Sequence, residues 1–137
     1  MTAQGAPRKY RSRHGARGKY GAVKTTYNGA VYDSKLEAGR AMALDALQAA
    51  GRIAGWRRGR DWLLFNEPHP RKPRRRLKRV YRPDFEVWTA PDQSDLWLED
   101  TKGVLTPVFR MKADLFVVVH PTVRLKVIKK DGSEEWL

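Results

Sequence analysis

The stretch that decides the fold runs from residue 80 to residue 102 and reads VYRPDFEVWTAPDQSDLWLEDTK. Valine and aromatic residues, which favour strands, recur before and after the segment APDQS at 90–94. That segment is made of residues typical of turns. We therefore predict neighbouring strands over 80–89 and 95–102, which form a hairpin at the centre of a sheet.

Upstream of this hairpin the sequence predicts a second hairpin, a helix and further strands. Asn28-Gly29 is a strong turn signal within residues 22–33, and Ser34 is a suitable cap for a helix that runs to Ala50. Residues 53–65 predict one or two strands. Residues 66–76 carry three prolines and a dense basic run, so we predict a mobile loop there.

Downstream, Thr106-Pro107 predicts the start of a helix that ends near residue 119, since proline favours the first helical position. Residues 123–127 alternate apolar and basic side chains and predict a last strand, followed after Lys130 by a polar turn. The order of hairpin, helix, strands, helix and strand predicts an α/β fold, with an α+β mixed sheet flanked by helices. Such a topology names no function by itself.

Composition favours one folded domain with a basic arm. Residues 1–18 contain almost no large aliphatic side chain, so we expect a flexible basic arm there and a folded domain over 19–137. The chain has no cysteine, which excludes disulfides and thiol chemistry and agrees with a reducing compartment. The longest purely apolar run, 115–119, is far too short to span a membrane. We expect a cytoplasmic protein.

Charge predicts a polyanionic partner. The chain has 28 lysine and arginine residues against 15 acids, a net charge of +13. Half of the basic residues lie in two segments, 8–19 and 71–82, which favours nucleic acid over the alternatives of a solubilising loop or a contact with anionic membrane. The candidate DNA-binding residues in these segments are Arg8, Lys9, Arg11, Arg13, Arg17 and Lys19, and Arg74, Arg75, Arg76, Lys78 and Arg79.

Four residues form a candidate catalytic cluster. Asp100 and Lys102 lie two apart on a predicted strand, so both side chains leave the same face of the sheet. Asp84 begins the neighbouring strand, where its carboxylate can approach that of Asp100. Glu37 lies on the first turn of the predicted helix, where it can also act as a capping residue with Ser34. Carboxylate oxygens are the ligands that suit Mg²⁺ or Mn²⁺.

These motifs resemble those of the PD-(D/E)xK nucleases, and within them the phage endonuclease I and Holliday-junction-resolvase-like members. Over residues 19–129, Pro83-Asp84-Phe85 resembles the PD motif and Asp100-Thr-Lys102-Gly103 the (D/E)xK strand. Glu37 resembles the helix carboxylate of that family. The resemblance implies a restriction-endonuclease-like core and a junction-gripping role for the basic arm.

The resemblance also implies an activity. It is that of a metal-dependent DNA endonuclease acting on branched DNA such as Holliday junctions, in phage recombination or DNA processing, as a homodimer. For a phage protein, this places it in the host cytoplasm. Asp84 and Asp100 would hold Mg²⁺, or Mn²⁺, with the main-chain carbonyl of Thr101 and support from Glu37. Lys102 would position the nucleophile or neutralise charge on the phosphate.

Several alternatives remain open at this point. Glu99 stands beside Asp100 and could be the ligand instead, although strand alternation turns Glu99 away from Lys102. Glu37 could act within its own subunit or in a partner's site. The protein could also be a non-catalytic basic nucleic-acid-binding protein, or a restriction- or transposase-type nuclease that acts on duplex DNA.

Overall fold

In a computed structural model of the chain, the structure describes residues 22–137. The expected arm, with Arg8, Lys9, Arg11, Arg13, Arg17 and Lys19, lies outside these described residues. In chain order the elements are β1 (Thr25–Tyr27), β2 (Ala30–Tyr32), α1 (Lys35–Ala49), β3 (Gly55–Arg58), β4 (Trp62–His69), β5 (Lys72–Tyr81), β6 (Phe85–Trp88), β7 (Trp97–Lys102), α2 (Pro107–Val119), β8 (Leu125–Lys129) and β9 (Glu134–Trp136). Within residues 22–137, no helix is long and apolar enough to cross a membrane.

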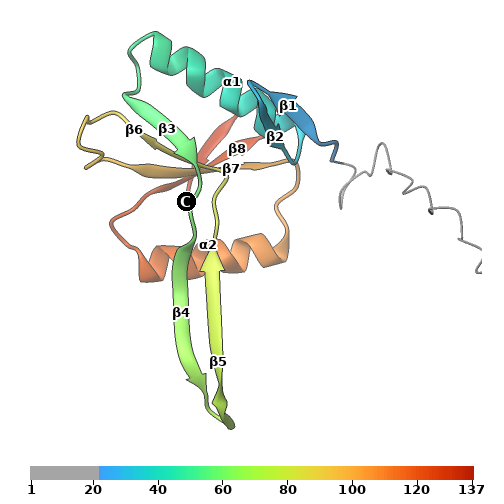
Figure 1. The fold of residues 1–137 in the computed structure, drawn as a ribbon, viewed down its shortest axis with the longest axis vertical. Helices are drawn as coiled ribbons and strands as arrows, with labels where there is room; N and C mark the ends of the chain where they lie inside the picture. Colours follow the sequence, from blue (N-terminus) through green and yellow to red (C-terminus); the bar gives the residue numbers. More distant parts are fainter. Residues whose placement is uncertain (1–21) are drawn as a thin grey trace, which may run out of the picture.

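A five-stranded mixed sheet in the order β3-β6-β7-β8-β9 forms the centre of the molecule (Figure 1). Neighbouring strands are antiparallel except β7 and β8, which run parallel because α2 connects them as a crossover. The predicted mixed sheet flanked by helices is confirmed at this level. The predicted central hairpin is also present, as β6 and β7.

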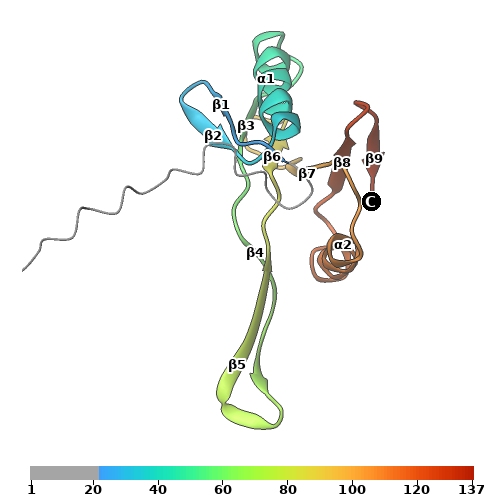
Figure 2. The same cartoon turned by 90° about the vertical axis from the view of Figure 1, so that its right-hand side faces the viewer.

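The two helices cover opposite faces of the sheet, as Figures 1 and 2 show together. Successive strand residues point to opposite faces, so each face receives its own apolar set. Beneath α1 the buried set is Tyr32, Ala38, Ala41, Leu44, Ile53, Phe85 and Val87. Beneath α2 it is Leu64, Tyr81, Leu98, Phe109, Ala113, Phe116, Leu125 and Val127.

The predicted turn and helix starts are confirmed. Asn28 and Gly29 both have positive φ, 48° and 78°, as a tight hairpin turn between β1 and β2 requires. The Ser34 side chain accepts a hydrogen bond from the Glu37 main chain at the start of α1. Thr106 caps α2 in the same way, followed by Pro107.

The prediction of a mobile loop over 66–76 is wrong. This segment belongs to β4 and β5, which pair with each other as an antiparallel two-stranded ribbon. Prolines are tolerated because both strands of such a ribbon are edge strands, and Pro68 lies at a shift in the register. The ribbon projects away from the sheet, past α2, in both views (Figures 1 and 2).

The prediction of one continuous strand over 80–89 is also wrong. β5 ends at Tyr81 and β6 begins at Phe85, so residues 80 and 81 pair with β4 while residues 85–88 pair with β3 and β7. Pro83, which has no amide hydrogen to donate, lies in the break. This break places Asp84 where the projecting ribbon meets the sheet.

The C-terminal end differs from expectation in two respects. The last large strand is Leu125–Lys129 rather than 123–127, because Leu125 pairs in parallel with Leu98. The tail after Lys130 is a turn, as predicted, but it continues into the short strand β9, which pairs with β8. β9 thus covers an edge of the sheet that would otherwise be open.

Candidate functional site

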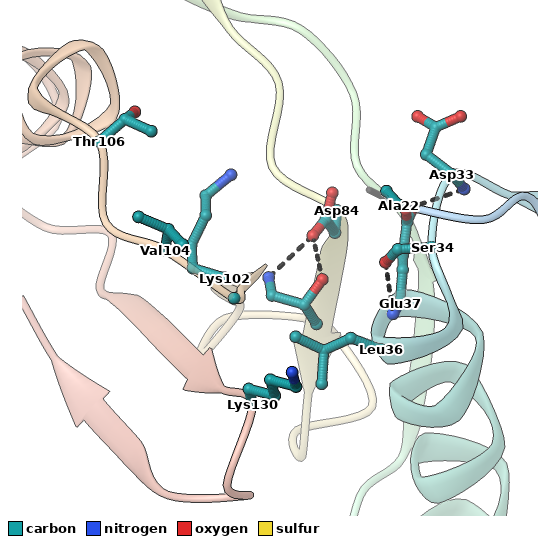
Figure 3. Close-up of a pocket in the computed structure, with 12 residues that line it drawn as sticks. Ala22, Asp33, Ser34, Leu36, Glu37, Asp84, Lys102, Val104, Thr106 and Lys130 are labelled. Atoms are coloured by element: carbon teal, nitrogen blue, oxygen red, sulfur yellow. Dashed lines mark hydrogen bonds between the residues drawn. The ribbon is translucent and has the colours of Figure 1, made fainter. Parts of the chain in front are cut away.

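Asp84 is fixed to β7 by two hydrogen bonds. The main-chain nitrogen of Thr101 donates to Asp84 Oδ2 at 2.8 Å, and the Thr101 hydroxyl donates to the same oxygen at 2.7 Å (Figure 3). Asp84 lies directly before β6, which pairs with β7, so the strand pairing brings the two residues together. Thr101, which the resemblance suggested as a carbonyl ligand, thus orients Asp84 through its amide and hydroxyl.

Asp100 lies next to Asp84 and is almost completely buried, with 2% of its surface exposed. Its Oδ1 is 3.1 Å from the ammonium nitrogen of Lys102, and its Oδ2 accepts a hydrogen bond from the hydroxyl of Tyr81. The Lys102 ammonium also lies 4.6 Å from the centre of the Phe109 ring, a favourable cation–π contact. The predicted same-face arrangement of Asp100 and Lys102 is therefore present.

Glu37 lies on the first turn of α1 and is buried. Its carboxylate accepts a hydrogen bond from the main-chain nitrogen of Asp33 at 3.2 Å and lies 3.5 Å from a guanidinium nitrogen of Arg58. The predicted capping box is therefore only half formed: the Glu37 main chain donates to the Ser34 side chain, but the Glu37 carboxylate accepts from Asp33 rather than from Ser34. Glu37 also lines, with Asp84, Thr101 and Lys102, a cleft of about 570 Å³ in which Figure 3 shows Asp84 between Lys102 and the helix start.

The carboxylates of this site oppose one another's ionisation. Burial and the neighbouring charge of Asp84 raise the pKa of Asp100 well above its usual value, and Lys102 counteracts this only in part. Burial and the same Asp84 charge raise the pKa of Glu37 to about 7. A cation bound between these groups would relieve both effects, so the site is electrostatically suited to a positive ion.

The donor chemistry also suits a hard divalent cation, with one restriction. Within residues 22–137, no three histidine or acidic side chains converge as a preformed metal cluster. Mg²⁺ commonly uses only one or two protein carboxylates and completes its shell with water and substrate phosphate. Asp84 and Asp100 supply such a pair. Asp84 and Glu37 line one cleft, Asp100 lines the adjoining one, and Lys102 lines both. The residues present therefore fit Mg²⁺ or Mn²⁺.

Glu99 is excluded as a member of this cluster by its position. It points to the opposite face of the sheet, where both its oxygens accept hydrogen bonds of 2.7 Å from Arg40. The indole nitrogen of Trp97 donates a third hydrogen bond at 3.1 Å, and Glu99 has no exposed surface. These contacts identify Glu99 as a buried structural carboxylate. Of the two neighbouring acids, Asp100 is therefore the candidate metal ligand.

Two residues at the site escaped the sequence analysis. Tyr81 contacts Asp100, but only the pairing of β5 with β4 shows where its side chain points. Gly59 lies against Pro83, and a Cβ at this position would overlap the Pro83 carbonyl oxygen. Its amide donates to the main-chain oxygen of Asp84 at 3.0 Å. A lone glycine directly after a strand was the available signal, because such a glycine often marks a close backbone approach.

The second group of predicted DNA-binding residues lies on the ribbon, away from the carboxylates. Arg74, Arg75, Arg76, Lys78 and Arg79 all belong to β5 and are exposed. Residues 82–84 join the base of the ribbon to the sheet, and these five cations lie farther along β5, outside the lining of the clefts that hold the carboxylates.

One comparison with known proteins gives a match. A family described as "Protein of unknown function (DUF1064)" matches residues 17–133. No curated protein and no solved structure matches the chain.

Proposed function

Because the chain belongs to the DUF1064 family, whose description states no function, we propose one from the site itself: a metal-dependent DNA endonuclease of the PD-(D/E)xK kind. Asp84, Asp100 and Lys102 would be its catalytic residues, with Glu37 in support. The proposal includes a restriction-endonuclease-like core, with which the mixed sheet and its two flanking helices are compatible.

The observation that carries the proposal is the buried carboxylate pair beside a lysine. Placing Asp100, 2% exposed, next to Asp84 costs folding free energy, because both burial and the neighbouring charge disfavour its ionised form. Clusters of this kind concentrate at functional sites. The Lys102 ammonium lies 3.1 Å from Asp100, and Lys102 lines both the cleft that holds Asp84 and the one that holds Asp100, where it could reach a phosphate.

Each residue has a role that follows from its position. Asp84, Asp100, the Thr101 carbonyl and Glu37 are the groups that would hold the cation. When bound, Mg²⁺ or Mn²⁺ would lower the pKa of a water molecule and neutralise charge on the scissile phosphate. Thr101 keeps Asp84 in one orientation, and Tyr81 does the same for Asp100. Lys102 supplies a positive charge to the phosphate.

For the substrate, we propose branched DNA such as a four-way junction, cut by a homodimer. The net charge of +13 supports a nucleic-acid substrate. The preference for junctions and the dimer follow from the resemblance to junction-resolving nucleases, since symmetrical resolution needs two cuts.

The test is cleavage of labelled DNA by the wild type and by variants that keep side-chain shape. We expect cutting of a four-way junction with Mg²⁺, none with EDTA, and a loss of at least about 100-fold in Asp84→Asn and Lys102→Met. Asp114→Asn and Lys35→Met, which change exposed residues outside the cluster, serve as matched controls and should cut normally. Circular dichroism and DNA binding would verify that each variant is folded.

Other outcomes would select the alternatives. A folded wild type that binds DNA but cuts none with Mg²⁺ or Mn²⁺ contradicts the nuclease and favours a non-catalytic binding protein. Equal cutting of duplex, nicked, flapped and four-way DNA contradicts junction selectivity and favours a restriction- or transposase-type nuclease.

A further inference from the structure

The β4–β5 ribbon, residues 62–81, is the most cationic feature of the described chain. It contains seven lysine and arginine residues and one acid, Glu67. All seven cations are exposed: Arg71, Lys72, Arg74, Arg75, Arg76, Lys78 and Arg79. None of them forms an ion pair with an acid of residues 22–137. Such uncompensated charge on a projection favours contact with a polyanion.

The base of the ribbon is firmly attached to the domain. The Trp62 ring packs edge-on against Phe116 of α2, with ring centres 5.8 Å apart, and Tyr81 packs against the same phenylalanine at 5.5 Å. The imidazole of His120 is hydrogen-bonded to the main-chain oxygen of Leu63 at 2.7 Å. Beyond this base the ribbon extends free of α2 (Figures 1 and 2). It is thus an anchored projection with a cationic far end.

The cations surround the ribbon instead of lying along one side. In the regular part of the pairing, Arg76 and Lys78 occupy one face and Arg79 the other. The remaining four, Arg71, Lys72, Arg74 and Arg75, lie at the tip. A ribbon that rested on a single phosphate backbone would need charge on one face only. Charge on both faces and at the tip matches an environment with phosphates on two sides, which is what a groove of a nucleic-acid duplex offers.

Dimensions select one groove. Paired strands lie about 4.8 Å apart. A two-stranded ribbon therefore fits the B-DNA major groove, which is about 12 Å wide, but not an undistorted minor groove of about 6 Å. The major groove of duplex RNA is deep and too narrow for side chains to read. We infer that the β4–β5 ribbon inserts into the major groove of a DNA duplex arm next to the candidate active site.

The ribbon also sets how far from the site this contact extends. Its strand β5 has 10 residues, or about 33 Å at roughly 3.3 Å per residue, close to one turn of B-DNA. Only residues 82 and 83 separate Tyr81 from Asp84, so the ribbon starts at the cleft. The position of the ribbon relative to a cleaved phosphodiester bond rests on the proposed function. The binding of the ribbon to duplex DNA does not depend on that function.

The experiment measures binding without cleavage, by fluorescence anisotropy in EDTA. The ribbon variant changes Arg74, Arg75, Lys78 and Arg79 to glutamine. It keeps Arg76 because that side chain bonds across the ribbon to Asn66 of β4, whereas Arg79 bonds only to the main chain of its neighbour Lys78. The control variant changes four exposed cations of the domain to glutamine: Lys24, Lys35, Arg52 and Arg110. Both lose four charges, so only the position differs. Circular dichroism would verify the fold of each.

On duplex DNA we expect the ribbon variant to lose at least about tenfold more affinity than the control variant. The slope of log affinity against log salt concentration should be smaller in the ribbon variant than in the wild type by about 3 to 4. On duplex RNA of the same sequence the two variants should differ little. Methylation of guanine N7, which lies in the major groove, should remove the advantage of the wild type over the ribbon variant, and a minor-groove ligand should not.

Equal losses in the two variants, or an equal ribbon effect on DNA and RNA, would overturn the inference. Failure of the nuclease proposal is distinguishable from this result. A protein that binds duplex DNA through the ribbon yet never cuts keeps the inference and loses the nuclease. If the wild type cuts DNA and the ribbon variant binds duplex DNA as tightly as the control variant, the nuclease proposal is kept and the ribbon inference is lost.

Discussion

Glu99 and Asp100 are consecutive residues of β7 that lie on opposite faces of the sheet and contact different side chains. Glu99 is enclosed by Arg40, Trp97 and Lys126 on the α1 side. Asp100 meets Tyr81 and Lys102 on the α2 side, next to Asp84. The alternation of a β-strand produces this separation, and two acids that are equivalent in the sequence become a structural ion pair and a candidate ligand.

The first prediction compares these two acids directly. We expect Mg²⁺ or Mn²⁺ to support cleavage by the wild type and to raise its melting temperature, and we expect Asp100→Asn to lose both effects while it stays folded. Glu99→Gln should instead lower the free energy of unfolding by about 3 kcal/mol, because it removes the buried charge that pairs with Arg40 at 2.7 Å and leaves Arg40 only the more distant Glu134 at 3.4 Å. Melting curves with and without metal measure both effects. A normal metal response in Asp100→Asn would contradict the assignment.

The second prediction concerns the hydroxyl of Tyr81. Its hydrogen bond lowers the otherwise raised pKa of Asp100, so Tyr81→Phe should raise that pKa further. Since protons compete with the cation for Asp100, half-maximal Mg²⁺ binding should then move to higher pH. Tyr27→Phe is the matched control, because it removes a tyrosine hydrogen bond to Asp45 on the α1 side. The same pH profile in both variants would show that Tyr81 has no role in positioning Asp100.

The third prediction is a pH dependence of stability due to Glu37. Its pKa of about 7 in the folded protein lies above the usual 4.5, so folding favours the protonated form. This contribution is fully present below about pH 4.5 and is lost as pH rises through 7. In EDTA the wild type should therefore lose up to about 3 kcal/mol of unfolding free energy over this pH range through Glu37, and Glu37→Gln should abolish that part of the decline. Urea unfolding from pH 4.5 to 8 measures it.

A suitable control for that experiment is the exposed Glu67. Glu67→Gln should keep the wild-type decline in stability with pH. Asp100 also has a raised pKa, so a smaller decline should persist in Glu37→Gln. If the free energy of unfolding of the wild type in EDTA rose between pH 5 and 8, the raised pKa values of Glu37 and Asp100 would be contradicted.

The fourth prediction concerns the close approach at Gly59. Gly59→Ala should lower the free energy of unfolding by about 1 to 3 kcal/mol and reduce metal binding, since its Cβ must displace Pro83 and hence Asp84. Gly103→Ala is the matched control, because a Cβ there meets no atom within 4 Å although Gly103 also lines the cleft. Chemical denaturation and metal titration measure the two effects, and equal behaviour of the variants would exclude a positioning role for Gly59.

The fifth prediction concerns the expected arm. Deleting residues 1–18 removes Arg8, Lys9, Arg11, Arg13 and Arg17, and should weaken DNA binding and reduce the salt slope by up to about 4.5. A full-length variant with these five residues changed to glutamine should behave as the deletion does, which separates charge from chain length. An unchanged salt slope in both proteins would refute the proposed contact with phosphate.

Local signals in the sequence were sufficient for part of this structure. Asn28-Gly29 predicted the first hairpin, and Ser34 and Thr106 predicted both helix starts, because each acts within a few residues of its own position. The alternation of Asp100 and Lys102 placed both on one face for the same reason. The sequence alone therefore determined the coarse class, the basic character and the core of the candidate site.

Contacts between residues that are far apart in the chain were decided only by the tertiary structure. Residues 66–76 form a ribbon because β4 finds its partner in β5, a pairing that local proline content argued against. The break at Pro83, the contact of Tyr81 with Asp100 and the burial of Glu99 against Arg40, 59 residues away, depend on which strands and helices pack together. Turn and capping energies are local, whereas strand pairing and burial are settled by contacts between segments far apart in the chain.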